Sequence, residues 1–130
     1  MAERPLSPHL TVYRWTYTMT LSILHRATGE ALAVALIGLI AWLVAASLGA
    51  EAYAALLPLL TGIPGRLMMA LAVTALIYHF CNGLRHLAWD LGLGFERRDA
   101  RRSALLVVAA TLIGAALCIY FIFRTGTGGA

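Results

Sequence analysis

Three long runs without a charged side chain constrain this chain more than any other feature of its sequence. Residues 31–50, 67–84 and 103–123 contain no Asp, Glu, Lys or Arg over 20, 18 and 21 residues. About 20 apolar residues are needed to cross the hydrocarbon core of a bilayer as a helix. Because these runs fill nearly half of the 130 residues, no second stretch is long enough for a soluble domain. The sequence therefore predicts an all-α membrane protein with three transmembrane helices.

The composition agrees with this class and excludes two others. Charged residues make up only 12% of the chain, about half of what a soluble domain carries. Disordered chains are rich in charge and poor in apolar residues, whereas 61% of this chain is hydrophobic. The net charge is +4 and every basic residue is an arginine. These arginines lie beside the apolar runs and form no single solvated face, so we expect no nucleic-acid partner.

Prolines, glycines and polar residues give the expected bounds of the segments. Pro58 and Pro64, with the glycines beside them, predict an outer loop over 49–65. We expect an interfacial, cytoplasmic N-terminal segment over 1–21, transmembrane helices over 22–48, 66–91 and 100–123, and a tail over 124–130.

The arginines divide unequally between the two sides of the membrane. Three crossings place the N-terminal segment and the second loop, between the helices expected over 66–91 and 100–123, on the same side of the membrane. That side would hold Arg4, Arg14, Arg26, Arg85, Arg97, Arg98, Arg101 and Arg102, and the other side Arg66 and Arg124. Arginine is enriched on the cytoplasmic side of membrane proteins. We therefore expect a cytoplasmic N-terminus in the bacterial inner membrane, in preference to the mitochondrial inner membrane.

One histidine stands inside a charge-free run, where an ionisable group indicates a functional site. His79, Gly83 and His86 are spaced i, i+4 and i+7 and share one helix face. Neutral imidazole is a good ligand for haem iron. His86 lies about 10 Å along the axis from His79, where it and Arg85 could meet haem propionates. The same pattern also fits a buried histidine beside a helix-packing glycine.

A second cluster opens the first apolar segment. Ser22, His25, Arg26 and Gly29 are spaced i, i+3, i+4 and i+7, and so also share one face. A hydroxyl and a guanidinium at the membrane boundary can bind a quinone oxygen near a source of protons. An N-capping serine and a snorkelling arginine are the alternative interpretation.

Three stretches carry a resemblance to a known family. They are residues 4–10, RPLSPHL, residues 22–29, SILHRATG, and residues 78–90, YHFCNGLRHLAWD. In this order they resemble the signatures of the cytochrome b membrane-anchor large subunit of succinate dehydrogenase, respiratory complex II. The likeness extends over the whole chain in length, helix number and order.

The resemblance implies a haem b and a ubiquinone site. His79 matches the axial ligand to the haem iron, and Trp15, Ser22 and Arg26 match residues lining the quinone site. Candidates for the haem propionates are His25, Arg26, Arg85 and His86. No catalytic residue is assigned, so the chain would be a non-catalytic or quinone-site subunit of an enzyme complex.

Partner chains follow from the same resemblance. A six-coordinate haem needs two axial ligands, and His79 is the only histidine deep in a span. We therefore expect a smaller hydrophobic anchor subunit to supply the second ligand within a heteromeric helical bundle. An iron–sulfur subunit and a flavoprotein subunit that oxidises succinate complete the implied complex, which passes electrons to ubiquinone. The alternatives are the anchor of a quinol:fumarate reductase and a non-redox helical transporter or structural anchor.

Overall fold

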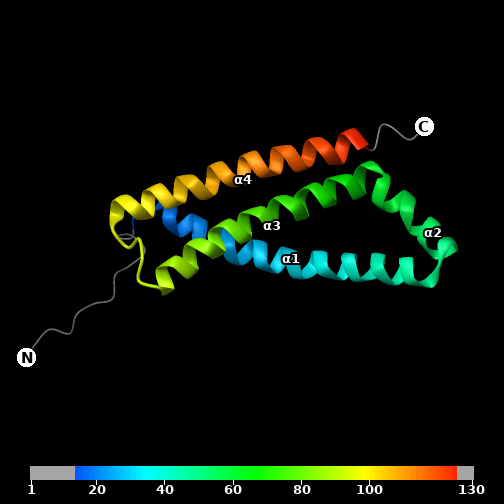
Figure 1. Ribbon diagram of the computed structural model, residues 1–130, viewed down its shortest axis with the longest axis horizontal. Helices are drawn as coiled ribbons and strands as arrows, with labels where there is room; N and C mark the ends of the chain where they lie inside the picture. Colours follow the sequence, from blue (N-terminus) through cyan, green and yellow to red (C-terminus); the bar gives the residue numbers. More distant parts are fainter. Residues whose placement is uncertain (1–13, 126–130) are drawn as a thin grey trace, which may run out of the picture.

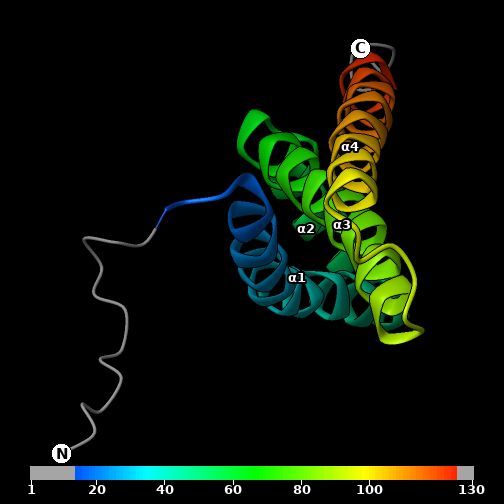
Figure 2. The same cartoon turned by 90° about the vertical axis from the view of Figure 1, so that its left-hand side faces the viewer.

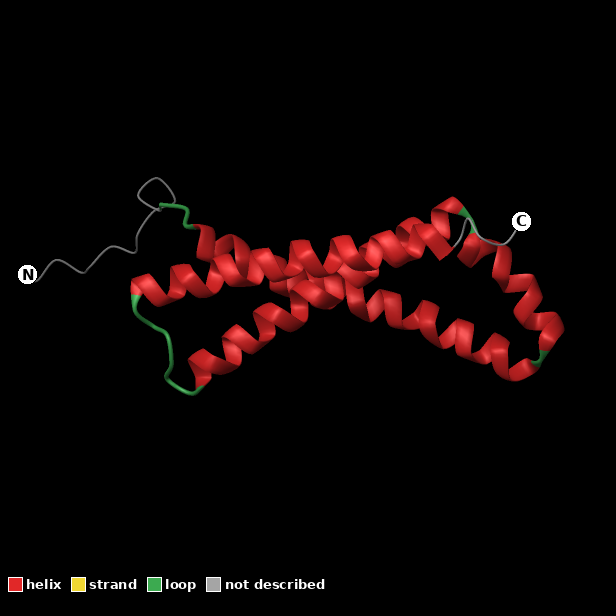
Figure 3. Ribbon diagram, turned by 45° about the horizontal axis from the view of Figure 1, so that its top comes forward, coloured by secondary structure: helices red, strands yellow, loops and turns green. Residues whose placement is uncertain are grey.

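The computed structural model describes residues 14–125, which form four helices and no strand (Figure 3). They are α1 (Tyr17–Leu48), α2 (Ala50–Thr61), α3 (Ile63–Asp90) and α4 (Arg97–Thr125). Three of them, α1, α3 and α4, are long and apolar enough to cross a membrane. The predicted all-α class with three membrane-length helices is therefore confirmed.

Each long helix begins earlier than the sequence analysis expected. The first begins at Tyr17 rather than at residue 22, and the others begin at Ile63 and Arg97 rather than at 66 and 100. Helical hydrogen bonds join backbone groups, so a helix continues past the end of its apolar stretch into polar residues. At 1.5 Å per residue α1 is about 48 Å long, more than the roughly 30 Å hydrocarbon core. The bounds of the membrane-crossing parts therefore stay predictions.

The loop expected over 49–65 is largely helical, so that expectation was wrong. Gly49 ends α1 with φ +109°, and the Ala- and Leu-rich residues after it form α2 because they favour helix. Pro58 lies inside α2, and the chain leaves helix only around Gly62. Gly65 makes the next turn possible, because a Cβ there would collide with the carbonyl oxygens of Leu59 and Leu60.

Helix α3 packs along both α4 and α1 (Figures 1 and 2). The face of α4 toward α3 carries small residues, which let two helices approach closely in a membrane. Its buried residues are Ala104, Val107, Thr111 and Ala115. A Cβ on Gly114 would lie 3.3 Å from the Ile77 side chain. This small-residue seam joins α3 and α4 into a pair, and α1 packs on α3 with a smaller contact to α4.

Most large apolar side chains stay exposed in the isolated chain. None of the most apolar 18-residue window of α1 is buried, and Val34 and Ile37 are about two-thirds exposed. A soluble monomer rarely exposes contiguous apolar patches of this extent. Lipid or further helices must therefore cover these faces.

The start of α1, the end of α3 and the start of α4 come together at one end of the molecule (Figure 1). Helix α2 and the end of α4 lie at the other end. Seven described arginines belong to the first end, which we call the arginine-rich end: Arg14, Arg26, Arg85, Arg97, Arg98, Arg101 and Arg102. Arg66 and Arg124 belong to the opposite end, and Arg4 lies outside the described residues. The fold thus gathers the arginines as expected from three crossings.

Candidate functional site

The candidate residues on α1 and α3 meet near the arginine-rich end. His79 lies eleven residues before Asp90, the last residue of α3, and hence about 16 Å along the helix axis from that end. His25 and Arg26 lie in the third turn of α1, which packs against this part of α3. The two clusters that the sequence placed on separate helices are therefore neighbours.

Three histidine rings lie in a row across the α1–α3 contact, which we call the histidine stack, although only the pair His25–His79 is parallel and His86 is tilted by 35° against His25. The His25 and His79 rings are stacked, with centroids 4.0 Å apart and planes 15° apart. The other face of the stack is His86, whose centroid lies 5.0 Å from that of His25. His86 in turn meets Trp89 edge-on at 5.2 Å. The sequence separated His79 and His86 along one helix, and the structure shows that His25 of α1 contacts both.

Hydrogen bonds determine which nitrogen of His79 is free. Its Nδ1 lies 3.0 Å from the backbone oxygen of His25 and 3.3 Å from Oγ1 of Thr28. A carbonyl oxygen only accepts, so Nδ1 of the neutral ring carries the proton and donates. The Thr28 hydroxyl donates to carbonyl oxygens of its own helix, which leaves its oxygen as a second acceptor. The lone pair of His79 is therefore on Nε2, the arrangement that a metal-ligating histidine needs.

Two glycines allow the histidine rings to lie this close to the opposite helix. A Cβ on Gly29 would be 3.0 Å from Cε1 of His79, and one on Gly83 would be 3.6 Å from Cε1 of His25. The contact is reciprocal, since each ring lies over the glycine of the other helix. The space beside Gly83 is thus occupied by the His25 ring.

Arg85 faces a different neighbour from the histidines. Its Nε donates to Oγ of Ser103 at 3.0 Å, and one terminal nitrogen donates to the backbone oxygen of Ala100 at 3.3 Å. The guanidinium carbon lies 4.0 Å from the centre of the Trp89 ring. Only 5% of the residue is exposed. Arg85 therefore joins α3 to the start of α4, and its predicted contact with a propionate stays a prediction.

The three quinone candidates are spread over the start of α1. Trp15 precedes the helix, is exposed, and donates from Nε1 to Oγ1 of Thr20 at 2.7 Å. The Ser22 hydroxyl donates to the backbone oxygen of Thr18 at 3.2 Å, so it must rotate before it can donate to a ligand. Arg26 follows Ser22 by one turn and is exposed. The cavities at helix contacts are lined by other residues, so the quinone-binding role of Trp15, Ser22 and Arg26 stays a prediction.

Two observations test whether the residues fit a haem. Nδ1 of His25 is buried without a hydrogen-bond partner in the described part of the chain, and Nε2 of His79 carries a free lone pair. Residues 14–125 contain no group of three or more His, Cys, Asp or Glu side chains that could hold a metal ion. The described residues therefore fit one axial histidine and one polar contact to a haem, and a second ligand from another chain stays a prediction.

Several contacting residues were not singled out from the sequence. Thr28 binds His79, and Tyr78 donates its hydroxyl to the backbone oxygen of Leu21 at 2.7 Å. Asn82, which is fully buried, reaches the same oxygen at 3.4 Å. The spacing of Tyr78, Asn82 and Arg85 at i, i+4 and i+7 could have revealed a second polar stripe on α3, since polar residues at helical spacing in an apolar run share one face.

Comparison with known proteins gives one consistent family. The family model described as succinate dehydrogenase/fumarate reductase transmembrane subunit matches residues 1–118. The human mitochondrial succinate dehydrogenase cytochrome b560 subunit is 40% identical over 116 residues, covering 86% of this chain and 68% of its own length. The cytochrome b556 subunit of Rickettsia bellii is 40% identical over 111 residues, covering 85% and 86%. That of Paracoccus denitrificans is 37% identical over 123 residues, covering 93% and 95%. The chain belongs to the succinate dehydrogenase/fumarate reductase transmembrane subunit family and is an integral membrane protein.

Proposed function

We propose that this chain is the haem b-binding membrane anchor of a succinate:ubiquinone oxidoreductase and forms part of its ubiquinone-reduction site. The observation that carries the proposal is the His79 imidazole, whose Nδ1 is hydrogen-bonded to the backbone oxygen of His25. A histidine held in this way inside a membrane span presents Nε2 as a ligand. The relatives named cytochrome b subunits support haem b as the group that it holds.

This chain's residues would hold the haem from two sides. His79 would ligate the iron. His25, which stacks on His79, and His86, which contacts His25, would lie toward the propionates with Arg26. Bound haem supplies a one-electron carrier close to the quinone site. The second axial ligand would come from a smaller anchor subunit, because His25 stacks directly on the ligating ring and His86 contacts His25 instead, so neither faces His79 across an iron.

The quinone site would lie at the start of α1. Arg26 would stabilise the negative charge that develops on a quinone oxygen during reduction, and the Ser22 hydroxyl would orient that oxygen. Trp15 would contact the ring at the membrane interface, where tryptophan is enriched. An iron–sulfur subunit would supply electrons from a flavoprotein that oxidises succinate, so both must dock at this end of the bundle.

The arginine-rich end would face the cytoplasm of a bacterium. Seven of the nine described arginines belong to this end, and cytoplasmic loops carry the excess of arginine. The soluble subunits would then dock from the cytoplasm, on the same side as the quinone candidates. A cytoplasmic N-terminus follows from the same asymmetry.

The close packing of Gly29 against the His79 ring allows a test of the haem site that leaves His79 itself in place. We expect Gly29→Ala to displace the imidazole by a few tenths of an ångström, because its Cβ would lie 3.0 Å from Cε1 of His79. The expected result is a shifted haem b spectrum and midpoint potential, measured by redox titration of the purified complex. Gly38→Ala is the matched control on the same helix, since a Cβ there meets nothing within 4 Å. Equal behaviour of the two variants would contradict the close contact at Gly29.

Purification of the whole complex tests the proposed function. With an affinity tag on this chain, we expect an iron–sulfur subunit, a flavoprotein and a second small membrane subunit to co-purify. The complex should reduce ubiquinone with succinate faster than it reduces fumarate with quinol. A faster reverse reaction would favour the anchor of a quinol:fumarate reductase. Absence of soluble subunits and of haem would favour a non-redox membrane protein instead.

A further inference from the structure

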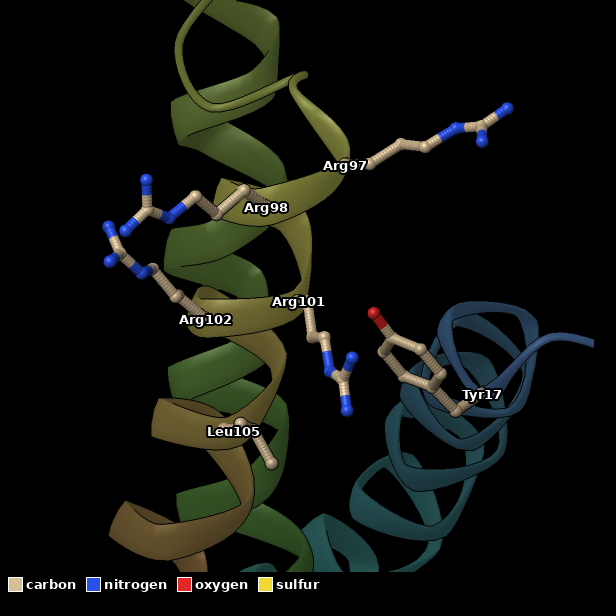
Figure 4. Close-up of a pocket in the computed structure, with 6 residues that line it drawn as sticks. All are labelled: Tyr17, Arg97, Arg98, Arg101, Arg102 and Leu105. Carbon is tan, nitrogen blue, oxygen red and sulfur yellow. The ribbon is translucent and has the colours of Figure 1, made fainter.

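A basic cavity outside the histidine stack lies between the start of α1 and the first turns of α4 (Figure 4). Its volume is about 580 Å³, within the range of small-molecule sites. Tyr17 lines it from α1, and α4 contributes Arg97, Arg98, Arg101, Arg102 and Leu105. None of these residues has a part in the proposed haem or quinone sites.

The arginines around this cavity repel one another. Arg98 and Arg102 are one helical turn apart, as are Arg97 and Arg101, and like charges at this spacing destabilise a helix. Figure 4 shows Arg98 and Arg102 extending to the same side of α4, while Arg101 extends toward Tyr17. No hydrogen bond or ion pair joins these four guanidinium groups to another residue in the described range 14–125. A bound anion would relieve this repulsion.

The level of the cavity relative to the membrane indicates which kind of anion it would bind. Arg102 is the last charged residue before the charge-free run 103–123, so the arginines stand where the helix enters the membrane. Leu105 lies one turn deeper and is 63% exposed, and Tyr17 on α1 is 50% exposed. The site thus presents cationic groups at the level of the lipid headgroups and apolar groups directly below them. This order matches a phospholipid, whose phosphate lies above its acyl chains.

We propose that this cavity binds the phosphate of an anionic phospholipid from the surrounding membrane. Arg97 and Arg101, which are one turn apart and both extend to the Tyr17 side of α4 (Figure 4), would bind phosphate oxygens, because the planar guanidinium donates two parallel hydrogen bonds to phosphate. Leu105 and Tyr17 would contact the glycerol backbone and the upper acyl chain. A soluble anion would make no use of this apolar wall. The bound lipid would hold the start of α4 against the start of α1.

Lipid binding to the purified complex tests the proposal. Detergent-solubilised, delipidated complex is titrated with phosphatidylglycerol, phosphatidylcholine or inorganic phosphate, and bound lipid is counted by native mass spectrometry. We expect tight binding of phosphatidylglycerol only, weakened at 0.5 M salt because charge pairing at an exposed site is screened. The double variant R97Q/R101Q should bind it roughly 30-fold more weakly, given about 1 kcal/mol per arginine at a membrane surface. Arg124→Gln, at the opposite end of α4, should bind as the wild type does.

Four results would overturn the proposal. Equal binding of phosphatidylglycerol and phosphatidylcholine would remove the role of charge, and competition by inorganic phosphate at equal concentration would indicate a soluble anion. Unchanged binding in R97Q/R101Q would place any lipid elsewhere. Loss of the soluble subunits from this variant, with lipid binding retained, would show that the arginines form a protein interface. The salt dependence is measured on the wild-type complex, so the proposal stays testable if the double variant does not assemble.

Discussion

Replacing His79 with alanine is expected to remove the b-type haem from the purified complex. His79 is the one histidine whose Nδ1 is hydrogen-bonded to a backbone oxygen in the described residues, with Nε2 left as a ligand. Loss of a residue that only orients a metal ligand already lowers metal affinity about 10–100-fold, and loss of the ligand itself should cost more. The dithionite-reduced minus air-oxidised spectrum measures the result as the disappearance of the b-type bands.

His86→Ala is the comparison that separates ligation from ring packing. It removes a ring of the same stack, 5.0 Å from His25, and leaves the proposed iron ligand in place. We expect its b-type bands to persist, with a shifted midpoint potential if the ring lies near a propionate. Subunit content on a gel checks that both complexes assemble. Unchanged bands in His79→Ala would reject the haem assignment, and loss of bands in both variants would assign the stack a packing role.

Replacing Arg26 with alanine is expected to lower succinate:ubiquinone activity about 100-fold, as for loss of one preorganised donor to a developing negative charge. Arg26 is exposed on α1, one turn after Ser22, so its guanidinium can reach a quinone at the boundary. Succinate oxidation by an artificial dye should be unchanged, because that reaction needs only the soluble subunits. The measurement is the ratio of the two rates in the same preparation.

Three further variants sharpen the Arg26 experiment. Ser22→Ala should have a smaller effect, about fivefold, because the hydroxyl already donates to the Thr18 oxygen and a single neutral hydrogen bond contributes about 1 kcal/mol. Arg26→Lys keeps the charge and should recover part of the quinone activity. Arg14→Ala removes another exposed arginine from the same end and should have no effect. Unchanged quinone activity in Arg26→Ala would move the site away from α1.

The membrane class could be predicted because it depends on local composition. A run such as 103–123 must leave water whatever it packs against, and α4 covers this run.

The expectation of a loop over 49–65 was wrong, because residues 50–61 form α2. Pro58 lies inside α2, whereas the sequence analysis took it as a helix breaker. Propensity alone does not reveal where neighbouring residues continue a helix.

The candidate site was predicted in part, because face-sharing on one helix is readable from spacing. His79, Gly83 and His86 do lie on one side of α3, and His25 and Gly29 on one side of α1. The partner of each face is a long-range contact that spacing does not contain. Arg85 shows how little the sequence reveals about these partners. It directly precedes His86, which contacts His25 of α1, and yet it binds Ser103 of α4.

The sequence by itself determined that this chain crosses a membrane three times, that its arginines gather at one end, and which histidine lies deep in a span. These properties follow from hydropathy and from the 100° turn per helical residue, and both are local. Only the tertiary structure decided that His25 contacts both His79 and His86, and that the backbone oxygen of His25 sets the tautomer of His79. It also decided that the α4 arginines border a cavity with Tyr17. Each of these depends on how α1 packs against α3 and α4, and that packing arises from contacts between residues some 50 or more positions apart.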